Sequence, residues 1–173
     1  PETQLAPVAF REQWEKVKGY VETGVEEGAR LAFGGDRPED APGDLFIQPT
    51  VLVDVDNEMR VAQEEIFGPV ASVISFADEA EALELANAVD FGLAGAVWTE
   101  DMNQAHRMVG GIRAGSVWVN DYRAVNFRSP FGGFKDSGLG SEGGPEGLSE
   151  YYRDKSVYYN YSGEVGDPFS LDT

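Results

Sequence analysis

The chain of 173 residues contains no cysteine and only one histidine, His106. Without cysteine, these residues hold no disulfide bond, no thiolate metal ligand and no cysteine nucleophile. Zinc sites are usually built from several His and Cys ligands, and this chain has only one such residue. We therefore expect no metal site. The spacing around His106 is helical, and a lone histidine in such a segment is typical of an exposed or half-buried position.

Long apolar runs are also missing. No stretch of about 18 apolar residues occurs, so we expect no membrane-spanning helix and no membrane partner. The first residues, Pro1-Glu2-Thr3-Gln4, lack the basic and then apolar pattern of a secretory signal. We therefore expect a cytoplasmic protein. Because the chain begins with proline, we interpret it as an excised piece or a processed start.

Basic residues are few. The chain has 13 Lys and Arg against 31 Asp and Glu, which gives a formal net charge of −18. Such a surface repels nucleic acid and anionic membranes, so we expect neither as a partner. The acids are scattered along the chain, which is typical of a solvated acidic surface. A more specific interpretation is that the protein is halophilic. At 1 M salt the Debye length is about 3 Å, so the salt screens the repulsion among the carboxylates of the surface.

What the sequence does contain is enough apolar residues for a core, at 42% of the chain. Apolar residues at steps of three and four predict an amphipathic helix over 10–28. An acidic, proline-rich surface loop over 38–43 and an extended segment over 45–55 follow. Further on, the patterns predict strands over 70–76, 93–98 and 116–119, with helices over 78–89 and 101–110 between them.

This alternation predicts an α/β fold with a mostly parallel sheet flanked by helices. The strands are apolar without alternation, which is typical of strands covered on both faces. A short helix over 144–152 and a last strand over Ser156–Tyr161 complete the chain. Val157, Tyr159 and Tyr161 would share one face of that strand. An exposed aromatic edge tends to aggregate, so this strand either pairs with another subunit or closes the chain's own sheet.

Two motifs allow more than one interpretation. The string Glu64-Glu65-Ile66-Phe67-Gly68-Pro69 has two adjacent carboxylates, which suggests acid–base chemistry. Neighbours on a helix point about 100° apart, so the alternative is a surface pair at a helix end before a Gly-Pro turn. The glycine-rich passage over 120–140 suggests a phosphate cradle. Its spacing matches neither known phosphate-loop motif, and a structural turn is the alternative.

Five strings together resemble the NAD(P)-dependent aldehyde dehydrogenase family. Each is modest alone, but their order and spacing are specific, and the resemblance covers essentially the whole chain. The strings are Gln13–Tyr20, Arg60–Val70 (EEIFGP in the family), Phe91–Thr99 (YGL and AVFT), Ala114–Asn120 (AGTVWVN) and Ser129–Gly138 (PFGGxKxSG).

The resemblance also implies what is absent. The family enzyme is several times longer, and its Rossmann-like domain largely precedes this region. Its nucleophilic cysteine, general-base glutamate and oxyanion asparagine lie upstream too. The chain therefore resembles the C-terminal part of the enzyme. Residues 1–153 correspond to part of the catalytic domain, and residues 154–173 to an oligomerisation strand and tail. A homo-oligomer, dimer or tetramer, is implied.

The resemblance assigns cofactor roles residue by residue. Glu65 matches the acid that holds the nicotinamide ribose hydroxyls, where a carboxylate accepts two hydrogen bonds from a diol. Phe67 matches the aromatic residue that packs beside this ribose. The implied cofactor is NAD or NADP. No catalytic residue of the family falls within the chain.

The same resemblance implies an aldehyde pocket. Phe131 matches an aromatic wall of the aldehyde tunnel, and Asn120 begins a loop beside it. Arg123 and Val125 fall at positions where family members differ with substrate. A cation at Arg123 would suit an anionic aldehyde, and a solvent-facing or ion-paired arginine is the alternative.

The implied reaction oxidises an aldehyde to a carboxylic acid through a cysteine thioester, with hydride leaving to NAD(P)+. Since the thiolate is missing, we expect these residues alone to be inactive. Two rival hypotheses remain: a non-catalytic interaction module that retains the family fold, and a dehydrogenase of the semialdehyde or acyl type.

Overall fold

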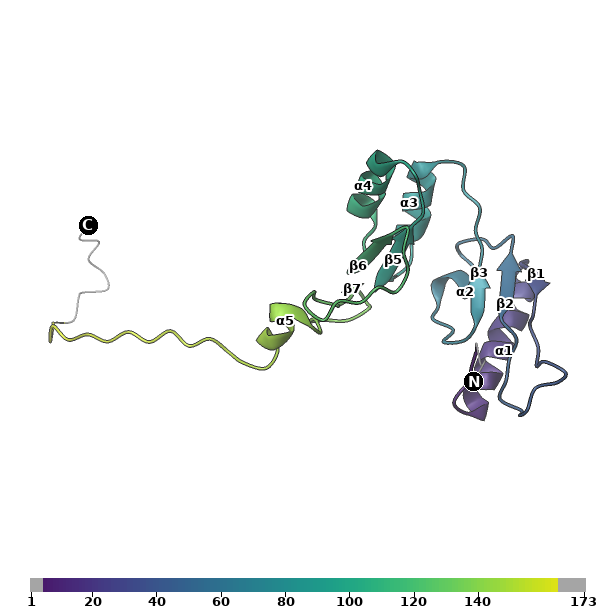
Figure 1. Ribbon diagram of the computed structural model, residues 1–173, viewed down its shortest axis with the longest axis horizontal. Coiled ribbons are helices and arrows are strands. Elements are labelled where there is room, and N and C mark those ends of the chain that lie inside the picture. The colour runs from purple at the N-terminus through teal and green to yellow at the C-terminus, as the bar shows by residue number, and fades with distance from the viewer. Residues whose placement is uncertain (1–4, 165–173) are drawn as a thin grey trace.

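The computed structural model describes residues 5–164, in which helices alternate with short strands (Figure 1). None of the helices in this range is long and apolar enough to cross a membrane. The elements in chain order are α1 (Arg11–Glu26), β1 (Arg30–Phe33), β2 (Thr50–Val53), α2 (Arg60–Gln63), β3 (Val70–Ser72), α3 (Glu79–Asn87), β4 (Phe91–Gly92), β5 (Ala94–Val97), α4 (Met102–Gly111), β6 (Ser116–Val119), β7 (Phe134–Lys135) and α5 (Gly144–Ser149).

The strands form three small sheets rather than the mostly parallel sheet that the sequence predicts. In the described range, the sheets have the orders β1-β2-β3, β4-β7 and β5-β6. The pairs β2-β3 and β5-β6 are parallel, whereas β1-β2 and β4-β7 are antiparallel. The fold is therefore mixed α/β. The expected strands over 70–76 and 93–98 exist but belong to different sheets, because α3 leads from β3 to a new group of elements (Figure 1).

The predicted helices are confirmed, and acidic caps explain where two of them begin. The carboxylate of Asp78 accepts a hydrogen bond from the Glu81 amide at 3.0 Å at the start of α3. Asp101 accepts one from the Asn103 amide at 2.8 Å at the start of α4. Each carboxylate satisfies an amide that has no partner in the first helical turn. The two helices are then joined by a bidentate ion pair, in which Arg107 donates to Glu79 at 2.7 Å.

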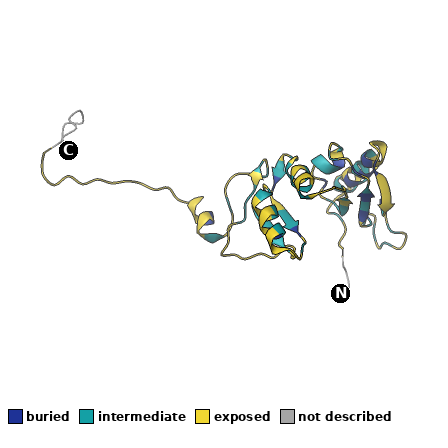
Figure 2. Cartoon of the chain, turned by 90° about the horizontal axis from the view of Figure 1, so that it is seen from above, coloured by how far each residue is buried: buried dark blue, intermediate teal, exposed yellow. Residues whose placement is uncertain are grey.

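Most of the buried apolar residues belong to one core around α1 and β2. In Figure 2, the residues coloured dark blue for burial gather in the part of the chain near the N-terminus. Val17 and Val21 face this core from α1, and Leu52 faces it from β2. The predicted apolar stripe of the helix is only partly buried, because Phe10 precedes the helix and Val25 is 47% exposed at its end. Thus α1 is anchored through its middle turns.

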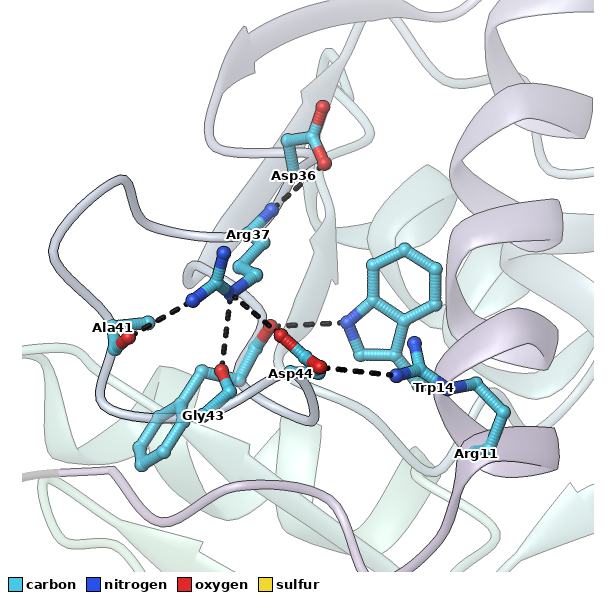
Figure 3. Close-up of polar contacts among 8 residues, drawn as sticks. Arg11, Trp14, Asp36, Arg37, Ala41, Gly43 and Asp44 are labelled. Atoms are coloured by element: carbon cyan, nitrogen blue, oxygen red, sulfur yellow. Dashed lines mark hydrogen bonds and ion pairs between the residues drawn. The ribbon is translucent and has the colours of Figure 1, made fainter.

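The predicted surface loop after β1 is held by polar contacts (Figure 3). The guanidinium of Arg37 donates to the carbonyl of Ala41 at 2.9 Å and to that of Gly43 at 3.0 Å. The indole of Trp14 donates to the Phe46 carbonyl at 3.0 Å. Because Trp14 belongs to α1, this contact fixes the end of the loop against the helix.

The predicted C-terminal strand is not seen in the single chain. After α5 the chain runs away from the other elements (Figure 1), and residues 152–161 join no sheet of the described range. The alternative in which this strand closes the chain's own sheet is therefore wrong. Pairing with another subunit stays a prediction. The rings of Tyr159 and Tyr161 stack with centroids 6.0 Å apart, as expected for side chains on one face of an extended segment. Residues 165–173 of the predicted tail lie outside the described range.

Candidate functional site

The two adjacent carboxylates of the Glu64-Glu65 pair differ in their hydrogen-bond partners. Glu64 ends α2 in an extended conformation and accepts two hydrogen bonds from the Arg60 guanidinium, at 2.8 and 2.9 Å. The Tyr20 hydroxyl donates a third, at 2.5 Å. The Arg60 contact, and then the Tyr20 contact, lower the pKa of Glu64 to about 2. Glu64 is thus held ionised, which removes it as a general acid or base near neutral pH.

The Glu65 carboxylate is exposed and has no hydrogen-bond or ion-pair partner among residues 5–164. It borders a cavity of about 380 Å³, which is also lined by residues from the end of α3 to β5, by the segment after α4 and by Ser137. Both oxygens are therefore free to accept hydrogen bonds from a ligand. A free carboxylate at the mouth of a cavity fits a vicinal diol, which is the chemistry expected for Glu65.

Phe67, two residues further along the same turn, is 74% exposed. Its backbone is left-handed, with φ of 54°, which is uncommon for a residue with a large side chain. Lys16 Nζ lies 6.0 Å from the centre of the ring. The exposed ring has the flat apolar surface that packing beside a ribose or a nicotinamide needs.

Helix α1 holds the backbone of this turn. Gln13 Nε2 donates to the carbonyls of Ile66 and Phe67, at 3.0 and 2.9 Å. Lys16 Nζ donates to the Glu65 carbonyl at 3.2 Å. Three successive carbonyl groups thus accept hydrogen bonds from one helix. Neither Gln13 nor Lys16 belongs to the residues predicted at the cofactor site, although their spacing of three residues places them on one helix face.

Of the residues expected at the aldehyde pocket, Val125 and Phe131 lie together. They line a cavity of about 320 Å³ with Trp118 of β6. The indole of Trp118 donates to the Ala124 carbonyl at 2.8 Å, which holds the loop that carries Val125. Trp118 is not among the residues predicted to line this pocket, although it lies within the resembling string Ala114–Asn120. The side chains of Trp118, Val125 and Phe131 give the cavity apolar surface, and Ser116, Asn126 and Ser129 add polar groups to its lining.

Asn120 and Arg123 lie apart from that cavity. The carboxamide of Asn120 accepts a hydrogen bond from the Thr99 amide at 2.9 Å and donates to the Thr99 carbonyl at 2.8 Å. Asn120 therefore fixes the end of β6 to the residues after β5. Arg123 is exposed, and its guanidinium lies 5.6 Å from the centre of the Tyr122 ring. Its charge is paired with no carboxylate in the described range.

Side chains of the glycine-rich passage make contacts within the chain. Lys135 Nζ donates to the carbonyls of Asn87 and Val89, at 2.8 and 2.7 Å, at the end of α3. The Ser137 hydroxyl accepts a hydrogen bond from the Gly92 amide at 2.9 Å. These contacts favour a structural turn over a phosphate cradle. His106 is exposed on α4, as predicted, and residues 5–164 contain no cluster of side chains that could hold a metal ion.

Comparisons with known proteins show which family the chain resembles over most of its length. The sequence model described as "Aldehyde dehydrogenase family" matches residues 1–157. The chain is 45% identical over 161 residues to the betaine aldehyde dehydrogenase of Bacillus subtilis, covering 92% of this chain and 33% of that protein. It is 52% identical over 149 residues to the 5-carboxymethyl-2-hydroxymuconate semialdehyde dehydrogenase of Escherichia coli, covering 83% of this chain and 32% of the relative.

Solved structures give the same result. An aldehyde dehydrogenase of Mycobacterium tuberculosis complexed with NAD+ matches with a TM-score of 0.89 and 46% identity, over 95% of this chain and 34% of that one. Betaine aldehyde dehydrogenase of Staphylococcus aureus in complex with NAD+ matches with a TM-score of 0.92 and 41% identity, over 98% of this chain and 34% of that one. The chain spans about a third of the length of these relatives. It belongs to the aldehyde dehydrogenase family.

Proposed function

We propose that the protein containing this chain oxidises an aldehyde to a carboxylic acid with NAD(P)+, and that this chain supplies parts of the cofactor and substrate sites. The observation that carries the proposal is the partner-free Glu65 carboxylate, on a turn that α1 fixes. Family membership supports this assignment, because the turn lies within the EEIFGP string. The reaction needs a thiolate that these 173 residues do not contain.

The side chains fit the cofactor by their chemistry. When bound, NAD(P)+ accepts the hydride that leaves the substrate. Glu65 accepts hydrogen bonds from the two hydroxyls of the nicotinamide ribose, and Phe67 packs beside this ribose. Together they restrict the orientation of the ring. Solved relatives in complex with NAD+ favour NAD over NADP.

Val125, Phe131 and Trp118 form one apolar wall of the aldehyde site in this proposal. For the substrate class, the exposed Arg123 favours an aldehyde that carries a negative charge. Its guanidinium attracts a carboxylate and repels a cationic aldehyde such as betaine aldehyde. The relative that acts on a carboxymethyl-substituted semialdehyde supports the anionic class, whereas the betaine aldehyde dehydrogenases support the cationic one.

The test of the cofactor role is Glu65→Gln in the full-length protein. The amide loses the charge-assisted hydrogen bonds to the ribose, so we expect kcat to fall by about 100-fold, and KM for NAD+ to change less. Glu15→Gln is the control, because Glu15 is an exposed acid of α1. An unchanged kcat in the Glu65 variant contradicts the assignment.

Two further measurements separate the alternatives. Material whose intact mass matches only these 173 residues should form no NAD(P)H from aldehydes. If this material turns over aldehydes, the proposal is contradicted. If the full-length protein is inactive, the result supports a non-catalytic module.

In the active protein, Arg123→Gln should lower kcat/KM for carboxylate-bearing aldehydes and leave kcat/KM for neutral aldehydes unaffected. An equal effect on both classes argues against the anionic substrate.

A further inference from the structure

Gln13 is the only side chain described here that donates to both the Ile66 and the Phe67 carbonyl. We infer that Gln13 is a positioning residue, which aims Glu65 and Phe67 at the cofactor from α1. This inference rests on the proposed function. Gln13 acts through the backbone of the turn and is assigned no contact with the substrate or the reacting atoms.

The geometry of the turn explains why such support is needed. In an extended segment, successive carbonyl groups point to opposite sides. Here the carbonyls of Glu65, Ile66 and Phe67 all accept hydrogen bonds from α1, so the backbone cannot be extended throughout. Phe67 adopts the left-handed conformation, which a side chain with a Cβ occupies at a cost. Contacts from outside the turn must therefore stabilise it.

The chemistry of the carboxamide suits this task. A glutamine side chain has two N–H donors on one nitrogen, and Gln13 uses them on two neighbouring carbonyls. Lys16, one turn further along the same face, adds a donor to the Glu65 carbonyl. The helix itself is anchored, since Val17 and Val21 are almost completely buried in the core. The turn is thus fixed to a helix whose middle turns pack in the core.

The inference distinguishes two substitutions. Gln13→Glu preserves the size of the side chain but replaces both donors with an ionised carboxylate, which repels the two carbonyls. Gln13→Leu removes the donors without adding charge. If Gln13 only fills space, the glutamate variant should resemble the wild type more than the leucine variant does. If Gln13 positions the turn, the glutamate variant should be the more impaired of the two.

The first readout needs no cofactor. In the isotopically labelled 173-residue chain, NMR should detect couplings across the hydrogen bonds from Gln13 Nε2 to the carbonyl carbons of Ile66 and Phe67. Both carbonyl shifts should change in Gln13→Leu. Val25→Glu is the charge control, because it adds a negative charge to an exposed position of α1 about 18 Å along the helix. Absent couplings, or carbonyl shifts that Gln13→Leu leaves unchanged, overturn the inference.

The second readout uses the full-length protein. We expect kcat to fall by about 10-fold in Gln13→Leu and by about 100-fold in Gln13→Glu, because a misplacement of about 1 Å costs on the order of 100-fold. The dissociation constant of NAD+, followed by fluorescence, should rise in the same order. Retention of kcat and NAD+ affinity in Gln13→Glu overturns the inference. A wild-type protein that neither binds NAD+ nor oxidises aldehydes defeats the proposed function instead, and the two failures are thereby distinguished.

Discussion

Gly68 lies directly against Val17, the fully buried residue at the centre of α1. A Cβ atom added to Gly68 would overlap both methyl groups of the valine. The turn that carries Glu65 and Phe67 therefore approaches the helix as closely as a backbone without a side chain allows. This contact gives the glycine of the EEIFGP string a packing role.

We expect Gly68→Ala to lower the free energy of unfolding by about 1–3 kcal/mol, because the extra methyl group overpacks the contact with Val17. Urea unfolding measures the change. Gly19→Ala is the matched control: nothing lies within 4 Å of a Cβ at Gly19 of α1, so it should stabilise the helix by roughly 0.5–1 kcal/mol. A double-mutant cycle with Val17→Ala should give a coupling between the two sites, and strict additivity would speak against this explanation.

The Glu64 carboxyl should titrate far below its ordinary range. Its pKa is about 2 in the folded chain and 4.5 when unperturbed. Because the folded value is the lower one, the stabilising effect of the ion pair is complete above pH 4.5 and is lost as the pH falls toward 2. NMR titration of the carboxyl carbon measures the midpoint. Arg60→Met removes the hydrogen bonds that lower the pKa of Glu64 most, so the pKa should rise toward 4.5 in this variant. A titration midpoint near 4.5 in the wild type would contradict the ion-pair geometry.

Lys135 should contribute to stability through the end of α3. Lys135→Met deletes two hydrogen bonds from a charged donor to the carbonyls of Asn87 and Val89. We expect a loss of about 1–3 kcal/mol in the free energy of unfolding. Lys155→Met is the control, since Lys155 is exposed in the segment after α5. Equal stability of the two variants would show that the Lys135 contacts are unimportant.

Stability should rise with salt. The net charge is −18, and every Asp and Glu of the described range is exposed except Glu79, which is half-buried. Repulsion among these carboxylates should lower the melting temperature in dilute buffer, and molar KCl should screen it. The double variant Glu39→Gln, Asp40→Asn should depend less on salt than the wild type. A melting temperature that stays flat from dilute buffer to molar KCl rules out the halophilic interpretation.

The segment after α5 should pair with another subunit. Its tyrosines are highly exposed in the single chain, with Tyr158 at 93% and Tyr161 at 89%. Tyr159→Pro removes a backbone donor from the predicted ladder, so we expect the oligomer to dissociate while the rest of the fold is retained. Tyr159→Phe keeps the backbone donor and the ring, and it should assemble normally. Light scattering that finds the same assembly in the proline variant contradicts this prediction.

The sequence determined the elements whose signals are local. Helices α3 and α4 begin where Asp78 and Asp101 cap them, and α1 follows the apolar spacing of Val17 and Val21. A cap or a helical stripe involves residues at most a few positions apart, so the chain carries this information within one or two turns. The five strings in their order likewise indicated the family, and the string around Glu65 indicated the candidate cofactor contact.

Only the tertiary structure decided which segments meet. Strands over 70–76 and 93–98 look equivalent in sequence, yet they lie in different sheets, because pairing depends on partners far along the chain. Glu64 and Glu65 are chemically identical neighbours. The pairing of Glu64 with Arg60 spans only four positions, but the hydrogen bond from Tyr20 to Glu64 spans 44 and depends on the folded backbone. Gln13 meets Phe67 across 54 positions, a contact for which no local pattern exists. The folded backbone brings these groups within hydrogen-bond distance, and the chemistry of the site follows from that approach.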